Sequence, residues 1–163
     1  MARDAYMHIE GIRGESADSK HQGWIKISDV QFGVAQPGSA TASTGGGHTA
    51  ERAELSDIVF SKAADMASPM LFQTCAMGKT IPKVKLELMR ADGNGEPIKY
   101  YEIELENVLI AQVRPTQNIS DILHETVGLK YSKIKCKYTQ QKIGGGIAGN
   151  TIGDWDLAAN KIA

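Results

Sequence analysis

Residues 83–106 read KVKLELMRADGNGEPIKYYEIELE, and they predict a long β-hairpin. Apolar and charged residues alternate from 83 to 88 and again from 101 to 106, which is the period of a strand with one buried face. Between the two runs, residues 92–95 (Asp-Gly-Asn-Gly) tolerate the left-handed backbone of a tight turn. This hairpin places the fold in the β class.

Strand-like segments flank the hairpin on both sides. They cover residues 6–12, 24–34, 55–62, 108–114, 133–138 and 151–157, with a possible break at 28–29. Short strands at such close spacing are typical of sandwiches and barrels rather than of a parallel α/β sheet. The sequence therefore predicts a mainly β fold: a small antiparallel β-barrel or two packed sheets, with one short flanking α-helix and a long extended loop.

The helix is predicted at residues 68–78. Ser68 is expected to be the N-cap, Pro69 suits the first turn, and Gly78 suits the left-handed position that ends a helix. The stripe expected to face the core consists of Leu71, Phe72 and Cys75.

The long loop contains an unusual run of small residues. Every residue from 38 to 47 is Gly, Ser, Ala or Thr, and the run lies between strands that end near Val34 and begin near Leu55. A connection this long without large apolar residues cannot form a core of its own, and such loops are usually functional or disordered. Two interpretations stay open: a flexible loop, and an arm ordered by a neighbouring subunit.

The bulk composition excludes several classes of function. A chain of 163 residues predicts one domain, and its net charge of −1 gives no basic field that would attract nucleic acid. The longest strongly apolar run, residues 108–111, is far too short to insert into a membrane. Residues 1–6 contain no apolar segment of the kind found in signal peptides.

The sequence offers little that resembles catalytic or ligand-binding chemistry. Residues 78–80 (Gly-Lys-Thr) close a helix instead of opening one, so they do not form a phosphate loop. The four histidines have no metal-ligand spacing and are expected to be mostly exposed. Cys75 and Cys136 are expected to be buried free thiols. We therefore expect no catalytic residue, no cofactor and no metal.

Two charged stripes and one polar strand face are candidate interaction surfaces. One stripe consists of the glutamates at 102, 104 and 106, and the other of the lysines at 133, 135 and 137. Each stripe is either a solvated face or a surface that meets opposite charges, across strands or across a subunit interface. Their candidate interface residues are Glu102, Glu104, Lys133 and Lys135. On the strand at 24–34, Asp29 and Gln31 share a polar face opposite an apolar one.

Several segments, taken in order, resemble the Hcp family, the haemolysin-coregulated tube subunits of bacterial type VI secretion. The segments are Gly14-Glu15-Ser16 with Asp18-Ser19, Gly23-Trp24, Gln36-Pro37-Gly38-Ser39, His48-Thr49-Ala50-Glu51-Arg52, Ser56-Asp57-Ile58-Val59-Phe60, Ser68-Pro69, Lys99-Tyr100, Gly128-Leu129-Lys130-Tyr131 and Tyr138-Thr139-Gln140-Gln141. None is diagnostic alone, but their order and spacing extend over nearly the whole chain, 1–163.

The resemblance implies a β-barrel subunit that forms homohexameric rings, which stack into a tube and carry small effector proteins in the lumen. It also implies spike, sheath and baseplate proteins as partners, and export from the bacterial cytoplasm without a signal peptide. Two alternatives stay open: a ring that acts as an effector carrier or chaperone, and the tail-tube protein of a phage-like particle.

Within this resemblance, the loop at about 36–50 becomes a candidate assembly arm, and Asp29 and Gln31 become a candidate lumen face. The candidate arm residues are Gln36, Pro37, Gly38, Ser39, Gly45, Gly46, Gly47 and His48. An extended arm of small residues suits this role, because the entropy cost of ordering it is offset only on assembly.

Overall fold

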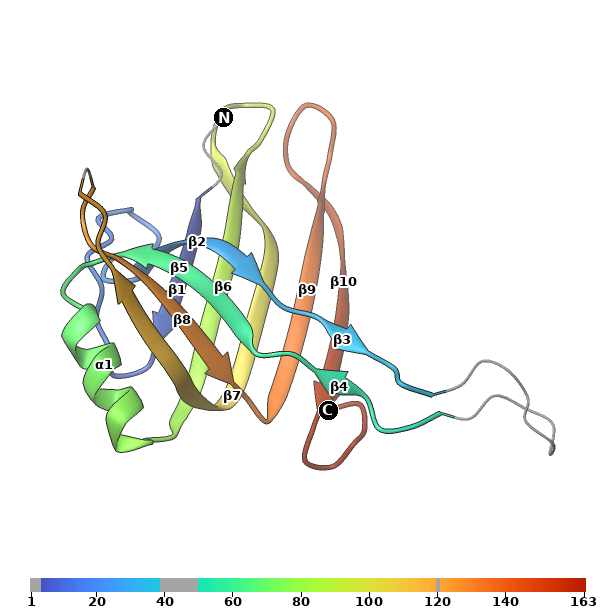
Figure 1. Cartoon of the computed structure of the whole chain (residues 1–163). Coiled ribbons are helices and arrows are strands. Elements are labelled where there is room, and N and C mark those ends of the chain that lie inside the picture. The colour runs from blue at the N-terminus through green and yellow to red at the C-terminus, as the bar shows by residue number, and fades with distance from the viewer. Residues whose placement is uncertain (1–3, 39–49, 120) are drawn as a thin grey trace, which may run out of the picture.

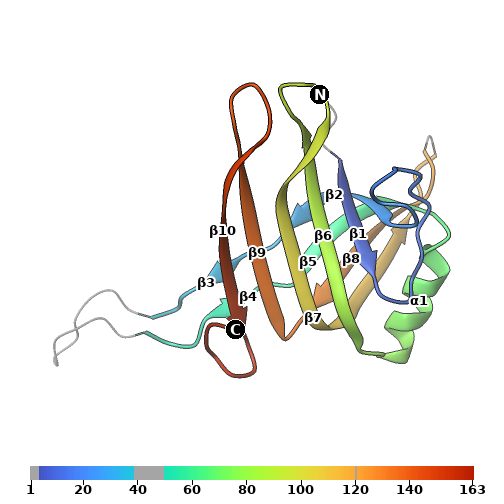
Figure 2. The ribbon, with the colours of Figure 1, turned by 180° about the vertical axis from the view of Figure 1, so that it is seen from behind.

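The computed structural model describes residues 4–38, 50–119 and 121–163. Its elements are β1 (Ala5–Ile9), β2 (Ile25–Gln31), β3 (Val34–Ala35), β4 (Glu54–Leu55), β5 (Ile58–Ala63), α1 (Ser68–Met77), β6 (Ile81–Ala91), β7 (Pro97–Thr116), β8 (His124–Lys130), β9 (Lys133–Gln141) and β10 (Ile147–Asp156). Strands follow the order β10-β9-β7-β6-β1-β2-β5-β8, and β8 also pairs with β7. Six antiparallel strands therefore close into a barrel, as the sequence predicted, and β9 and β10 extend the sheet beyond it (Figures 1 and 2).

Strand β7 belongs to both halves of the barrel. Its first part pairs with β6 from Pro97 to Val108, and its second part pairs with β8 from Leu109 to Thr116. The sequence predicted two strands here, and the structure has one of 20 residues. Asn107 lies where the partner changes and has a φ of 52°, a conformation that asparagine tolerates better than most residues. This one residue turns the strand without ending it.

The core lies inside the barrel and under α1. Its fully buried side chains include Met7, Ile25, Ile58, Phe60, Leu71, Ile103, Val108, Val127 and Leu129. Alternation along the predicted hairpin brings Ile103 and Leu105 inward and leaves the glutamates between them on the outer face. Burial of these apolar side chains is the main stabilising contribution to the fold.

Helix α1 differs from the prediction at its first turn and on its apolar stripe. The N-cap is Ala67, and Ser68 is the first helical residue, because its hydroxyl is bonded to Lys62 and Glu125 instead of to the helix amides. Phe72 is 61% exposed, so the stripe that faces the core consists of Leu71 and Thr74, with Cys75 half-buried. Gly78 ends the helix with a φ of 64°, as its position suggested.

Strand β2 ends in a bulge that redirects the chain. Ser28 pairs with Ser61 and Gln31 with Val59, so the register shifts between them, and Asp29 has a φ of 51°. The predicted alternation through residue 34 is therefore wrong. Phe32 is 39% exposed and Val34 70% exposed, because the chain has left the barrel at this point.

Candidate assembly surfaces

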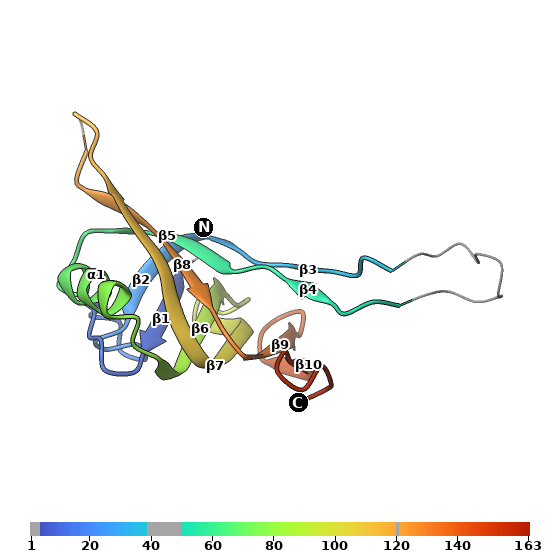
Figure 3. The same ribbon diagram turned by 60° about the horizontal axis from the view of Figure 1, so that its bottom comes forward.

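Strands β3 and β4 form a two-stranded ribbon that projects from the barrel (Figure 3). It contains the pairs Val34–Leu55 and Ala35–Glu54. It is the base of the predicted arm: Gln36 and Pro37 are exposed, and Gly38 is half-buried. The other candidate arm residues, Ser39, Gly45, Gly46, Gly47 and His48, lie outside the described residues.

The side chain of Gln36 connects the two limbs of this ribbon. Its Nε2 donates to the carbonyl of Glu51 at 2.9 Å, and its Oε1 accepts from the amides of Glu51 and Gly38, both at 3.0 Å. The carboxamide thus pairs with Glu51 as a backbone peptide group would in a ladder. The next residue, Arg52, donates from Nη2 to the carbonyl of Leu157, just after β10. The two limbs are therefore joined to each other at the outer end of the described ribbon, and one of them is also bonded to the body of the molecule.

Asp29 and Gln31 are both exposed at the end of β2. The bulge between Ser28 and Gln31 interrupts the strand parity from which the sequence placed the two residues on one face. Their position on the surface is open to solvent, and their assignment to a lumen stays a prediction.

The charged stripes lie together on the outer face of four neighbouring strands. Glu104 of β7 lies between Lys85 of β6 and Lys135 of β9, and Asp154 of β10 follows Lys135. The next row is Lys83, Glu106, Lys133 and Asp156. In this row the Lys133 ammonium is 3.8 Å from Glu106 and 3.7 Å from Asp156.

In a third row Glu102 of β7 lies between Glu87 of β6 and Lys137 of β9, so opposite charges meet only on the β9 side, where Lys137 Nζ is 3.7 Å from Glu102. Lys99 of β7 itself lies near both glutamates, with its Nζ 2.8 Å from Glu102 and 3.3 Å from Glu87. We call these three rows the charge ladder. All four candidate interface charges, Glu102, Glu104, Lys133 and Lys135, belong to it, so each meets opposite charges across strands of its own chain. Participation in a subunit interface stays a prediction.

A buried histidine cluster lies beneath the loop at residues 14–24, where the sequence suggested only a polar turn. His8 and His124 are exposed as expected, but His21 is 2% exposed, and its ring stacks on Tyr6 at a centroid distance of 4.3 Å. Nδ1 is 2.6 Å from Asp18 Oδ2 and Nε2 is 2.5 Å from Glu87 Oε2. An imidazolium satisfies both contacts by donating from each nitrogen.

The cluster also makes one carboxyl more acidic. The hydrogen bond to His21 holds the pKa of Asp18 below its ordinary value. A carboxyl whose pKa falls on folding stabilises the native state above its ordinary pKa, and this contribution is lost as the pH falls through the lowered value. The spacing Asp18-x-x-His21 is the only local signal of this cluster, because Glu87 is distant in the sequence.

A second buried cluster connects β5, β8 and α1. Lys62 is 1% exposed, and its ammonium lies 2.8 Å from both Asp65 Oδ1 and Glu125 Oε2. It also donates to Ser68 Oγ at 3.0 Å, and Ser68 donates to Glu125 at 2.7 Å. Two ion pairs and the hydrogen bonds of the serine connect these elements, so the cluster links them structurally.

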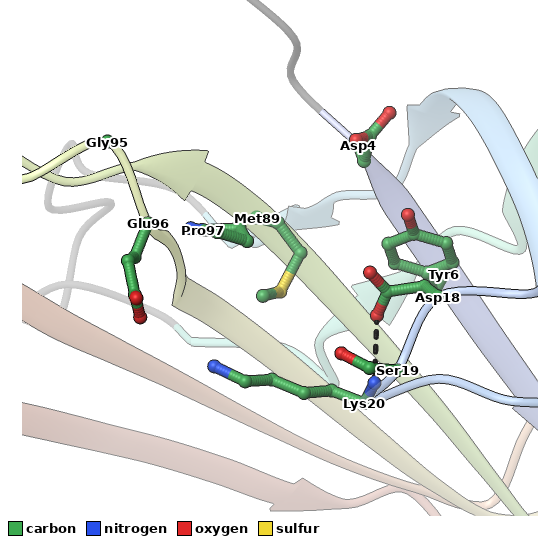
Figure 4. Close-up of a pocket in the computed structure, with 9 residues that line it drawn as sticks. All are labelled: Asp4, Tyr6, Asp18, Ser19, Lys20, Met89, Gly95, Glu96 and Pro97. Carbon is green, nitrogen blue, oxygen red and sulfur yellow. Dashed lines mark hydrogen bonds between the residues drawn. The ribbon is translucent and has the colours of Figure 1, made fainter.

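The surface hollow drawn in Figure 4 has a volume of about 300 Å³ and lies between β1, the loop at 14–24 and the β6–β7 turn. Its lining residues are Asp4, Tyr6, Asp18, Ser19, Lys20, Met89, Gly95, Glu96 and Pro97. Burial raises the pKa of Tyr6, and the negative charges of Asp4 and Asp18 raise it further, so this phenol stays protonated. The only hydroxyl nucleophile besides Tyr6, that of Ser19, has no histidine among these residues to activate it.

The rest of the described chain shows no metal-ligand cluster and no activated thiol. Within residues 4–38, 50–119 and 121–163, no group of His, Cys, Asp or Glu could hold a metal ion. Cys75 and Cys136 are free thiols but only half-buried, so the expectation of full burial is wrong. Burial raises the pKa of Cys136, and this effect is larger than the opposite effect of the hydrogen bond with Tyr101. The thiol is therefore weakly nucleophilic. In the part of the chain described, no helix is long and apolar enough to cross a membrane.

Comparison with known proteins identifies the family. The family model described as "Type VI secretion system effector, Hcp" matches residues 6–138. Protein hcp1 of Pseudomonas aeruginosa PAO1 is 31% identical over 162 residues, which is 98% of each chain. Among solved structures, Hcp1 from Salmonella typhimurium has a TM-score of 0.81 at 30% identity, with complete coverage of both chains.

A second solved structure, described as that of a type six secretion system protein, has a TM-score of 0.89 at 25% identity and covers 99% of this chain and 100% of its own. The resemblance first drawn from short segments is thus confirmed over the full length. The barrel, the projecting ribbon and these matches together place the chain in the Hcp family of type VI secretion proteins.

Proposed function

We propose that this chain, acting as one domain over residues 1–163, is the structural subunit of a type VI secretion inner tube. Six copies form a ring, rings stack, and small effector proteins travel in the lumen. The role is not enzymatic. Its partners are further copies of itself, the effectors, and the spike, sheath and baseplate proteins, and the protein leaves the bacterial cytoplasm when the apparatus fires.

The observation that carries this proposal is the β3–β4 ribbon. It holds Val34 at 70% exposure outside a barrel whose own core is complete. Exposed apolar residues on a projecting ribbon, here Val34 and Ala35, are a feature that assembly would cover. A head-to-tail contact of this kind closes into a ring when its rotation closes, and a second contact between rings gives a filament.

The proposal is tested by the mass of the purified protein in solution. Light scattering should give six times the subunit mass of 17.6 kDa, and electron micrographs of the same material should show annular particles. A monomer that stays monomeric at high concentration and in the presence of the spike protein would contradict the ring.

Deletion of residues 38–47 should leave the barrel folded and weaken assembly. The deleted run lies beyond the Gln36–Glu51 pairing, so this pairing, the two backbone pairs and the core remain, and only the Gly38 amide bond to Gln36 is lost. Thermal unfolding followed by circular dichroism should change little, whereas sedimentation should show fewer rings and tubes. If the shortened protein assembles normally, the segment is only a loop.

Substitution of Asp29 and Gln31 tests the lumen proposal. Asp29→Asn suits the φ of 51° at this position, and Gln31→Lys adds a charge to an exposed site. Rings of the double variant should form normally but retain less effector in a co-purification assay. Unchanged effector retention together with unchanged assembly would remove these residues from the lumen face.

A further inference from the structure

We propose that Gln36 and Arg52 are positioning residues that fix the direction of the arm in the free subunit, before a second copy of the chain receives it. This inference rests on the proposed assembly function. It assigns to two side chains the task of fixing the base of the arm, residues 34–38 and 50–55, instead of leaving this base to be ordered by the neighbour.

The backbone of the ribbon is too short to hold itself. It has two residue pairs, Val34–Leu55 and Ala35–Glu54, and none of the four side chains is fully buried. Isolated two-stranded ribbons are marginal in water even when longer. The base of the arm therefore needs additional contacts to keep one direction.

Gln36 supplies the first of these contacts. Its carboxamide accepts a hydrogen bond from the amide of Glu51 and donates one to the carbonyl of the same residue, which adds one rung to the ladder without using the backbone of its own limb. The amide of Gly38 also bonds to its Oε1 at 3.0 Å, so the chain beyond the rung is held as well. One side chain thus fixes both limbs at the point where the described ribbon ends.

Arg52 supplies the second contact, and this one reaches the body of the molecule. Its guanidinium donates to the carbonyl of Leu157, whose own amide donates to the carbonyl of Ser132 at 2.8 Å. Leu157 packs against the core, so its carbonyl is a fixed point. Figure 1 shows the ribbon leaving the barrel beside the C-terminal turn that follows β10. The two contacts define the direction of the ribbon relative to the sheet.

A preordered arm associates more readily because less conformational entropy is lost on binding. The gain occurs at every subunit contact of a ring. Loss of the Gln36 rung should therefore raise the concentration needed for half-maximal assembly roughly tenfold, the effect of a few exposed hydrogen bonds.

The direct test is Gln36→Glu. The variant keeps the length and acceptors of the side chain but loses the Nε2 donor and sets a carboxylate against the Glu51 carbonyl. Subunit unfolding should be unchanged, whereas assembly measured by sedimentation should shift as stated. Gln73→Glu is the matched control, because Gln73 is exposed on α1, on the far side of the barrel from the ribbon, and should assemble normally (Figure 1).

A cross-link separates positioning from direct contact with a neighbour. Ala35 and Glu54 are paired across the ribbon, at a spacing that suits a disulfide, so Ala35→Cys with Glu54→Cys can lock the limbs. The background carries Cys75→Ser and Cys136→Ser and must itself assemble. Oxidation should restore assembly to the Gln36→Glu variant, and reduction should remove it again. Failure to restore assembly after complete oxidation would overturn the positioning role.

Hydrogen exchange of the free subunit keeps this inference distinct from the proposed function. The amides of Gly38 and Glu51 should be protected in the wild type and should exchange roughly tenfold faster in Gln36→Leu, which lacks the Oε1 acceptor, and in Arg52→Ala. If the wild type forms no rings but shows this protection, the proposed function fails and the ordered arm stands. If these amides are unprotected in the wild type, the inference fails whatever the protein assembles into.

Discussion

Replacement of Lys62 by methionine should lower the free energy of unfolding by about 3–5 kcal/mol. The ammonium lies between the carboxylates of Asp65 and Glu125, and Glu125 is only 3% exposed. Without the lysine, a buried negative charge loses its partner, and the Ser68 hydroxyl loses one of its hydrogen bonds in the cluster. Urea unfolding at fixed subunit concentration measures the change, since assembly would otherwise contribute to the apparent stability.

Two further variants show whether burial is the cause. Lys26→Met removes an ion pair with Asp4 whose side chains are 65% and 34% exposed, and it should cost less than about 1 kcal/mol. Lys62→Met combined with Glu125→Gln should recover a large part of the loss, because the uncompensated charge is gone. A Lys62 variant no less stable than the Lys26 variant would show that water reaches the cluster.

Replacement of Gly14 by alanine should cost about 3 kcal/mol. A Cβ at this position would lie 2.4 Å from the carbonyl oxygen of Trp24 and 2.8 Å from the Cα of Ile25, and backbone atoms cannot move aside as a flexible side chain would. The amide of Gly14 donates to the carbonyl of Gly23, and a hydrogen bond between Ser16 and Gly23 completes a short ladder that brings the two backbones this close. The clash would separate the two ends of the loop that covers His21.

Chemical unfolding measures this loss, and Trp24 reports its location, because its ring packs on His21 at 4.9 Å. Gly149→Ala is the matched control, since an added Cβ there meets nothing within 4 Å, and its effect should stay within about 0.5 kcal/mol. Equal stability of the two alanine variants would mean that the loop shifts without cost.

The class of the fold could be predicted from short stretches of sequence. In a strand with one buried face, apolar and polar residues alternate, and this alternation is visible within a few residues. The hairpin at 83–106 and the end of α1 at Gly78 follow from such stretches. The paired segments Gly14-Glu15-Ser16 and Gly23-Trp24 supported the family resemblance, and the structure joins them by backbone hydrogen bonds. Both are local or nearly local relations.

The two buried clusters could not be predicted from such stretches, because their partners are distant in sequence. Lys62 meets Glu125, and His21 meets Glu87. One signal was available for the first: Ile58, Phe60 and Lys62 share the inward phase of one strand, where a lysine needs a buried partner. For the candidate arm, length and composition predicted its position, but not that Gln36 would substitute for a backbone rung.

The charge ladder determines the electrostatic potential that this face of the molecule produces in the surrounding solvent. In the first two rows of the ladder, lysine and acidic residues alternate at the spacing of neighbouring strands, about 5 Å, which is shorter than the screening length of about 8 Å in physiological salt. The potentials of these adjacent residues therefore cancel a short way into the solvent. At that distance the surface therefore has little net electrostatic potential, although it carries many charges. It holds water tightly, but it neither attracts nor repels another protein according to the sign of that protein's charge.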